Sequence, residues 1–499
     1  MQVRTILRIL GLLIAVFSVT LLPPAALAYF YEDGGGWAFL SAFVLSLAIG
    51  LLIWYPNRDK RQELKTREGF IIVVMFWVVL GSVGAIPFWM PDAYSLSFTD
   101  SMFESFSALT TTGATILTGI DELPHAYRFY RQQLQWLGGM GIIVLAVAIL
   151  PILGIGGIQL YRAEMPGPMK DSKMTPRIAD TAKQLWYIYL GITIACALAY
   201  WAAGMTPFNA VGHAFSTVAI GGFSTHDASM GYYDNPVIHM ICVLFLLIAA
   251  VNFALHFAAF PRMYSRRVNG KNERDWSKGS LLTYSRDPEF RALMGIQFAL
   301  MLVVVLTLVS QRFHPDWSDS LFHGIFQAVS IATTAGFTTE SYVTWPLFLP
   351  VLLIFASFIG GSAGSTGGGL KVIRVLLLYR QGKREIDRLV HPKGVFTVKW
   401  GDKALPDRVV QAVWGFFATY ALLFVIIMLL FIATGLDDYS AFGATAATLN
   451  NLGPGLGEVA SNFTTVSDPG KWIAILSMLF GRLEIFTLLV LFTPAFWKH

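Results

Sequence analysis

The sequence predicts an all-α polytopic membrane protein with ten transmembrane helices, eight of which form four fused repeats of span, half-helix and span. Three observations predict this class. Of the 499 residues, 55% are apolar and only 13% are charged, about half the charged fraction of a soluble domain. Ten apolar runs approach the roughly 20 residues that a helix needs to cross a bilayer. A glycine-centred motif recurs four times between these runs.

The predicted spans follow one another along the whole chain. They occupy residues 6–22, 37–55, 70–90, 134–160, 185–205, 236–260, 292–310, 345–379 (interrupted), 409–434 and 472–497. The first run also has features of a signal peptide, because Arg4 and Arg8 precede its apolar centre and Ala26-Leu27-Ala28 follows it. A retained span is favoured, since the run is long for a signal core and another span follows at once.

The basic residues predict the orientation of these spans. If the N-terminus is cytoplasmic, 31 of the 36 Lys and Arg residues fall on the cytoplasmic side and four on the opposite side, and Arg482 lies within a span. The positive-inside rule then places both termini in the cytoplasm. The outer side is net acidic, with 16 acidic residues. An acidic surface raises the local concentration of cations.

The recurring motif divides the chain. Residues 107–113, 216–222, 330–336 and 447–453 each end in glycine, and the glycines lie 109, 114 and 117 residues apart. Each motif ends a helical run of about ten residues, too short to span, and the runs begin at the N-cap candidates Ser97, Thr206, Asp316 and Asp437. We therefore expect an additional N-terminal helix pair (1–68) and four repeats (69–160, 161–263, 264–380 and 381–499).

Four such turns predict one shared pore for a cation. Non-helical backbone at membrane depth must be buried in protein or line water. The C-terminal end of a half-helix carries partial negative charge, and the carbonyls of a turn can replace the water shell of potassium. Glycine permits the left-handed backbone that the turn needs. No Asp or Glu stands directly before the four glycines, which favours a carbonyl filter over a carboxylate ring. A single such turn is more often a packing feature, but four in register favour a filter.

These features resemble the TrkH-type subunits of the Trk/Ktr/HKT superfamily of potassium transporters. The resemblance runs from about residue 70 to the C-terminus, and spans 6–22 and 37–55 match the extra helix pair of TrkH-like members. It implies potassium uptake, by conduction or cotransport, across the bacterial inner membrane, with K⁺ as the transported ion and no tightly bound cofactor. It also implies a homodimer in membrane lipid with a cytosolic TrkA-like nucleotide-binding regulatory subunit. We expect neither an enzyme nor a nucleic-acid partner.

The resemblance also assigns the filter. The two residues before each glycine would supply ligand carbonyls, so the implied filter comprises Thr111, Thr112, Gly113, Ile220, Gly221, Gly222, Thr334, Ala335, Gly336, Asn451, Leu452 and Gly453. The sequence Thr-Val-Gly-Tyr-Gly does not occur and the four turns differ. We therefore expect fewer ion sites and looser selectivity than a fourfold-symmetric filter would have.

A glycine-rich segment interrupts the eighth span at residues 360–369. Six glycines in ten residues disfavour a helix, since each costs roughly 1 kcal/mol relative to alanine. The resemblance implies an intramembrane gate loop formed by Gly360, Gly361, Ser362, Gly364, Ser365, Thr366, Gly367, Gly368 and Gly369; a packing role remains the alternative. The segment also matches the Gly-x-Ser-x-Gly pattern of hydrolases, but that elbow requires a strand-to-helix turn.

Arg482 is expected deep within the last span, where an arginine costs roughly 2.5–3.5 kcal/mol on insertion scales. It could pair with Glu484 or with helix-end carbonyls. Alternatively, it could place a positive charge in the conduction path, and the resemblance favours this role of pore plug. His213, Asn252 and His256 are interpreted as packing residues.

Two other function classes are less well supported. A secondary transporter of another small solute or of sodium would have paired inverted repeats, whereas these four repeats run parallel. An intramembrane enzyme would need converging His, Asp or Glu, and only Arg482 and Glu484 are expected to be charged deep within spans.

Overall fold

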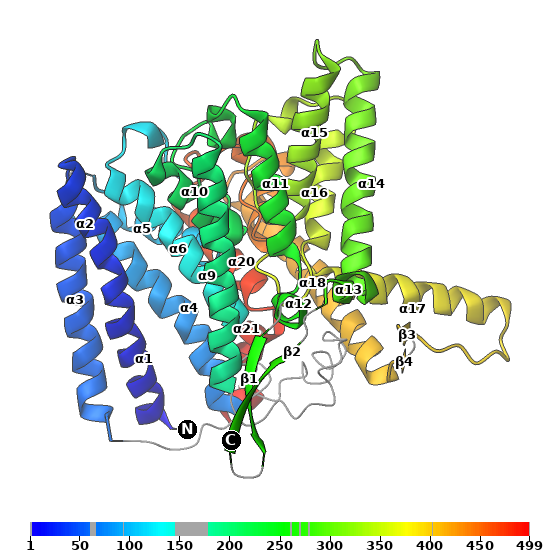
Figure 1. Cartoon of the computed structure of the whole chain (residues 1–499), viewed down its shortest axis with the longest axis horizontal. Coiled ribbons are helices and arrows are strands. Elements are labelled where there is room, and N and C mark those ends of the chain that lie inside the picture. Colours follow the sequence, from blue (N-terminus) through cyan, green and yellow to red (C-terminus); the bar gives the residue numbers. More distant parts are fainter. Residues whose placement is uncertain are drawn as a thin grey trace.

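The computed structural model describes residues 2–59, 66–92, 94–144, 178–259, 262–268, 271–277, 280–401 and 403–498. Long helices stand side by side in a bundle, and an arm formed by α17 (Val372–Val390) projects from its side (Figure 1). At one edge of the bundle, α1 (Val3–Ser18) continues through a 3₁₀ turn into α2 (Leu22–Tyr31) and packs beside α3 (Gly36–Trp54). An ideal Cβ on Gly50 of α3 would lie 2.6 Å from the amide nitrogen of Ala15. The two backbones therefore touch, as is common at small residues between membrane helices.

Beyond α3, the described chain repeats one order of elements four times. A long helix comes first: α4 (Thr66–Trp89), α9 (Ile178–Ala202), α14 (Pro288–Ser310) and α18 (Asp407–Ala433). A short helix follows: α5 (Phe98–Leu109), α10 (Pro207–Val218), α15 (Trp317–Ala332) and α19 (Asp438–Leu449). After the glycine turn comes a further helix: α6 (His125–Val144), α11 (Pro236–Ala250), α16 (Leu349–Ile359) and α20 (Asp468–Arg482).

Three of the four helices that follow the turns are bent or broken. α11 meets α12 (Phe253–Ala259) at 93°, and α20 meets the helical segment Phe486–Phe492, which begins with α21 (Phe486–Leu489), at 110°. At the second bend, Glu484 and Ile485 have φ of 53° and 44°, which is incompatible with a continuing helix. The predicted spans 236–260 and 472–497 are thus bent, and 345–379 is broken into α16, a loop and α17.

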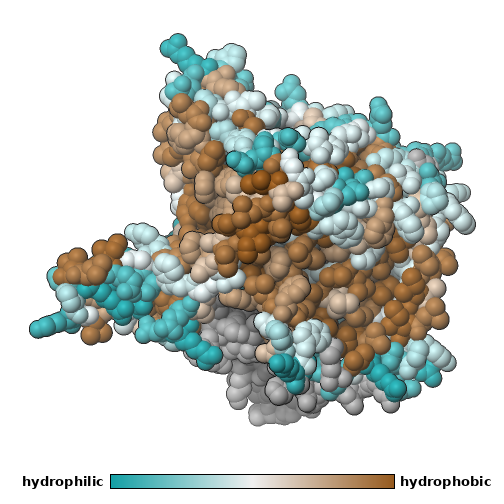
Figure 2. Space-filling model, turned by 180° about the vertical axis from the view of Figure 1, so that it is seen from behind, coloured by the Kyte–Doolittle hydropathy of each residue, from teal (hydrophilic) through white to brown (hydrophobic). Residues whose placement is uncertain are grey.

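Among the described residues, six helices are long and apolar enough to cross a membrane, or up to eight if each bent pair counts as one span. The predicted span 134–160 lies partly outside the described residues. Its described part belongs to α6, which begins nine residues earlier than expected and carries several polar residues, including Arg131 and Gln135. The count of ten therefore remains a prediction. Apolar side chains form a band across the molecule with polar residues at both ends (Figure 2), as expected of a multi-pass membrane protein.

Short β-strands lie in the basic loops, and the all-α prediction did not include these strands. β1 (Arg262–Val268) pairs antiparallel with β2 (Lys271–Ser277), with Arg262 opposite Ser277, and β3 (Lys399–Trp400) pairs with β4 (Lys403–Ala404). α13 (Leu282–Arg286) precedes α14, and α22 (Pro494–Trp497) closes the described chain. The β1–β2 hairpin lies at the same end of the bundle as both termini (Figure 1).

Candidate functional site

The four glycine turns share one backbone conformation. In each, the glycine and the residue two positions before it have positive φ: Thr111 49° and Gly113 81°, Ile220 52° and Gly222 79°, Thr334 69° and Gly336 80°, Asn451 52° and Gly453 97°. The amide just before each glycine donates to a carbonyl five residues earlier, with distances of 2.8 to 2.9 Å. The short helices therefore all end in the same way, by a left-handed turn that satisfies a terminal carbonyl.

The four turns meet in a closed ring. Each glycine lies against the carbonyl of the residue that precedes the next glycine. An ideal Cβ would lie 2.1 Å from Gly221 O if built on Gly113, 2.0 Å from Ala335 O on Gly222, 2.2 Å from Leu452 O on Gly336, and 2.7 Å from Thr112 O on Gly453. Side chains essentially never approach this closely. Glycine is therefore needed at these positions for close approach as well as for its left-handed φ.

Most of the expected ligand carbonyls accept no hydrogen bond from the residues that the structure describes. Of the eight carbonyls that precede the glycines, only that of Gly221 accepts a hydrogen bond from the described residues, at 2.6 Å from Gln135 Nε2. All eight residues are buried. A buried carbonyl normally has a hydrogen-bond partner, so a ring of seven without a donor is suited to bind a cation.

The short helices direct their C-terminal ends at this ring. Their N-termini are capped where the sequence predicts: the side chains of Ser97, Thr206 and Asp437 accept backbone hydrogen bonds of 3.1, 3.3 and 2.6 Å. Asp316 stands at the predicted N-cap but makes no such bond. The backbone hydrogen bond from Ser440 lowers the pKa of Asp437 below its ordinary value. The four helix dipoles place partial negative charge around the ring.

The glycine-rich loop lies against three of the turns. Thr366 Oγ1 donates to the carbonyl of Val218 at 3.0 Å, Gly368 N donates to Thr334 Oγ1 at 2.7 Å, and Gly369 N donates to the carbonyl of Asn450 at 3.1 Å. These partners belong to the second, third and fourth repeats. The predicted gate-loop residues are thus brought together with the predicted filter residues.

Arg482 joins the same loop to the first turn. Its guanidinium donates to Thr111 Oγ1 at 2.5 Å and to the carbonyl of Thr366 at 3.2 Å, and the residue is only 6% exposed. Glu484 instead pairs with Arg374 at 2.8 Å, so the alternative of an Arg482–Glu484 pair is wrong. With Arg482, the loop is connected to all four turns.

Further contacts hold the two ends of the loop. Ser362 N donates to the carbonyl of Ala250 at 2.8 Å, where α11 ends. The carboxylate of Glu289 accepts hydrogen bonds from Ala363 N at 2.8 Å and Ile373 N at 3.3 Å. It thereby links the loop to the first turn of α17. Lys371 donates to the carbonyl of Gly367.

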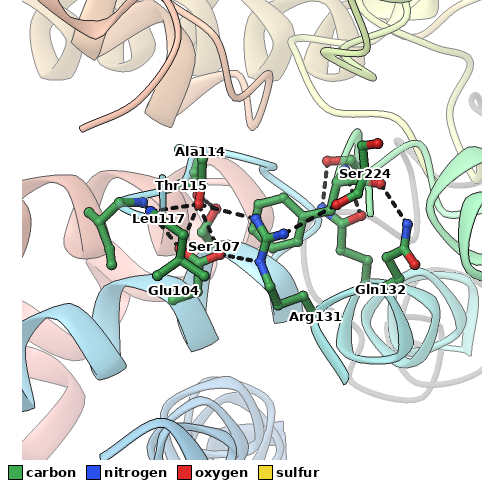
Figure 3. Close-up of polar contacts among 12 residues, drawn as sticks. Glu104, Ser107, Ala114, Thr115, Leu117, Arg131, Gln132 and Ser224 are labelled. Carbon is green, nitrogen blue, oxygen red and sulfur yellow. Dashed lines mark hydrogen bonds and ion pairs between the residues drawn. The ribbon is translucent and has the colours of Figure 1, made fainter. Parts of the chain in front are cut away.

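Several charged groups lie deeper than the sequence suggested. Glu104 on α5 and Arg131 on α6 are 0% and 1% exposed and form an ion pair at 2.6 Å (Figure 3). Glu289 and Arg374 are also buried, so buried charge is not confined to the predicted pair of Arg482 and Glu484. The available signal was Glu104 itself, a carboxylate within an otherwise uncharged half-helix core.

The other polar candidates are satisfied by packing partners, as interpreted. His213 lies 2.8 Å from the Asn209 carbonyl and 2.9 Å from Ser224 Oγ. His256 contacts the Tyr284 hydroxyl at 2.7 Å. Asn252 accepts the amide of Ala254 at 2.8 Å, which starts α12 after the bend.

Comparison with known proteins gives a consistent family. Residues 35–499 match the family model of TrkH, described as a cation transport protein. The chain is 63% identical over 498 residues to the Trk system potassium uptake protein TrkH of Vibrio parahaemolyticus and 60% identical over 502 residues to that of Escherichia coli K12, with all of each chain covered. The crystal structure of the potassium transporter TrkH from Vibrio parahaemolyticus matches with a TM-score of 0.90 and 60% identity, over all of both chains.

Proposed function

The chain belongs to the TrkH family of cation transport proteins, and from this we propose that it carries potassium across the bacterial inner membrane into the cell. The family is one of transporters, not enzymes. The observation that carries the proposal is the ring of four glycine turns, in which seven of the eight expected ligand carbonyls accept no hydrogen bond from the described part of the chain. K⁺ is the transported ion, and no cofactor is implied.

In this proposal, the ring is the selectivity filter. A potassium ion gives up water and gains the carbonyls that precede the glycines, while the four half-helix dipoles favour its positive charge. The turns differ in sequence, and one carbonyl, that of Gly221, already accepts a hydrogen bond from Gln135. Both features support a filter whose ion sites are fewer and less regular than those of a fourfold-symmetric filter.

The loop at residues 360–369 is proposed as the gate and Arg482 as the plug. Hydrogen bonds hold the loop against the turns, which supports a role in closing the ion path. Arg482 adds a positive charge at this point, which repels a cation in a low-dielectric environment. α17 follows the loop directly and projects from the bundle (Figure 1). A cytosolic TrkA-like nucleotide-binding subunit that displaced α17 would therefore move the loop.

The remaining assignments are proposed together with this function. The chain is proposed to act as a homodimer in the lipid of the inner membrane, with both termini cytoplasmic. Residues 1–68 form the additional helix pair and 69–160, 161–263, 264–380 and 381–499 form the four pore repeats.

The test is potassium-dependent growth of a bacterial strain that lacks its own potassium uptake. Wild-type protein should restore growth, and Gly336→Ser should weaken the rescue or its preference over sodium, because its Cβ would lie 2.2 Å from the Leu452 carbonyl. Gly191→Ser is the matched control, since a Cβ there meets nothing within 4 Å. Equal rescue by Gly336→Ser would mean that the turns serve in packing and do not form a filter. Sodium uptake without potassium uptake would favour sodium as the substrate.

A further inference from the structure

In three of the four repeats, the same position of the half-helix contacts the chain that leaves its turn, and the chemical group at that position differs from repeat to repeat. Nine residues before each glycine stand Glu104, His213, Gln327 and Ala444. The Glu104 carboxylate accepts Thr115 Oγ1 at 3.0 Å, and the corresponding contact of His213 is to Ser224 Oγ at 2.9 Å. Gln327 donates to a carbonyl further along the exit segment, that of Glu340, at 2.6 Å, and Ala444 has no polar atom to offer. Only the first repeat uses a charged group.

Arg131 extends this support from the first turn to the second. Its Nε donates to Glu104 at 2.6 Å, one terminal nitrogen donates to Thr115 Oγ1 at 3.1 Å, and the other donates to the carbonyl of Ser224 at 3.2 Å. Thr115 and Ser224 each lie two residues beyond a ring glycine. Figure 3 shows the guanidinium between the two segments. It also lies 4.1 Å from the centroid of the Phe223 ring.

Two neighbours of Arg131 on α6 continue the contact with the second turn. Gln132 Nε2 donates to the Phe223 carbonyl at 3.1 Å. Gln135 donates to the carbonyl of Gly221 at 2.6 Å and accepts the amide of Phe223 at 3.1 Å. One face of α6 therefore fixes the backbone of the second turn, while the Glu104–Arg131 pair fixes the exit segments of both turns relative to each other.

Stability alone gives little reason for such a pair. A fully buried ion pair loses the hydration of both groups, and apolar residues of similar volume are often equally stable in its place. The planar guanidinium, in contrast, presents several donors in a fixed fork. This geometry is suited to hold two backbone segments at a set spacing, and the ring carbonyls lie within three residues of those segments.

We propose that the Glu104–Arg131 pair is a positioning unit that sets potassium over sodium discrimination by fixing the first and second turns of the ring. The proposal rests on the filter function proposed above. Potassium and sodium differ in the size and number of the carbonyl cage that suits them. A ring whose first two turns can relax inward would accept the smaller ion more readily.

The test compares purified proteins in liposomes by the ratio of potassium to sodium flux. Glu104→Gln should lower this ratio by about tenfold, because it removes the charged acceptor that holds both Arg131 and the exit segment of the first turn, while sodium flux does not fall. The double variant Glu104→Gln/Arg131→Met removes both charges, so it leaves no unpaired buried charge and should show the same loss of ratio. Arg131→Lys keeps the ion pair without the fork and should lie between these variants and wild type.

Two controls separate the possible causes. Asp33→Asn removes a carboxylate that accepts His125 Nδ1 of α6 at 2.7 Å, outside the turns, so it loosens the same helix and should leave the ratio unchanged. Gly336→Ser tests the filter itself. An unchanged ratio in the folded double variant, with a lowered ratio in Gly336→Ser, would overturn the positioning role alone. Unchanged ratios in both would overturn the filter.

Discussion

Adding one methyl group to the glycine-rich loop should open the ion path that the loop is proposed to close. An ideal Cβ on Gly368 would lie 1.9 Å from the backbone carbonyl oxygen of Asn450, whereas real Cβ contacts are not shorter than 3.0 Å. Since neither atom belongs to a flexible side chain, Gly368→Ala must displace the loop by about 1 Å. The hydrogen bonds from Gly368 to Thr334 and from Gly369 to Asn450 would be lost. At about 1 kcal/mol each, this amounts to about 2 kcal/mol against the closed position, or roughly a 30-fold shift of the closed–open equilibrium.

The assay is potassium flux through the purified protein in liposomes, without a regulatory subunit. Gly368→Ala should raise the flux toward 30-fold if the wild-type loop is mostly closed. Gly295→Ala serves as the matched control, because a Cβ there meets nothing within 4 Å. A correctly folded Gly368→Ala protein with wild-type or lower flux would refute the argument that this loop closes the path.

Three further outcomes are expected. Arg482→Gln should raise potassium flux several-fold, because the guanidinium donates to Thr111 and forms no ion pair within the part of the chain that the structure describes, so its charge repels a cation; unchanged or lower flux in inserted protein would contradict the plug role. Ser97→Ala removes a cap at the start of α5 and should cost about 1 kcal/mol, seen as a lower thermal midpoint in detergent; an unaltered midpoint would count against the cap. Burial opposes ionisation of Asp121, but its hydrogen bonds with His226 and Asp227 outweigh burial and hold its pKa below the usual 3.8. Its stabilising contact should therefore persist above pH 3.8 and be lost at lower pH, which hydrogen exchange of residues 119–123 would report; loss of protection well above 3.8 would refute the assignment.

The local features of the site were readable from the sequence. Short helix, cap and glycine turn depend on residues close together in the chain, and their fourfold spacing was visible without a structure. The contact between the loop and the turns could not be predicted from local sequence, because Thr366 and its partner Val218 are far apart in the chain. The resemblance to a known family, rather than the spacing, suggested that arrangement.

Tertiary contacts explain the two features that the sequence did not predict, the early start of α6 and the bend after Arg482. The apolar run of the fourth predicted span begins only at residue 134, so hydropathy leaves Arg131 outside the span. In the structure α6 begins at His125, since its polar face is covered by the second turn instead of lipid. The bend after Arg482 has a similar origin: the residues there are apolar enough to continue a helix, but Glu484 is held by Arg374 from α17. Hydropathy carries no information about such partners.

The most direct test of the account is to locate the bound ion. Crystals of the protein grown with rubidium, a potassium analogue with anomalous scattering, should show anomalous density on the axis of the ring, among the carbonyls of Thr112, Gly221, Ala335 and Leu452. Sodium-grown crystals should lack a comparable site. Rubidium density elsewhere in the molecule, with none at the ring, would contradict the claim that these four turns form the potassium filter.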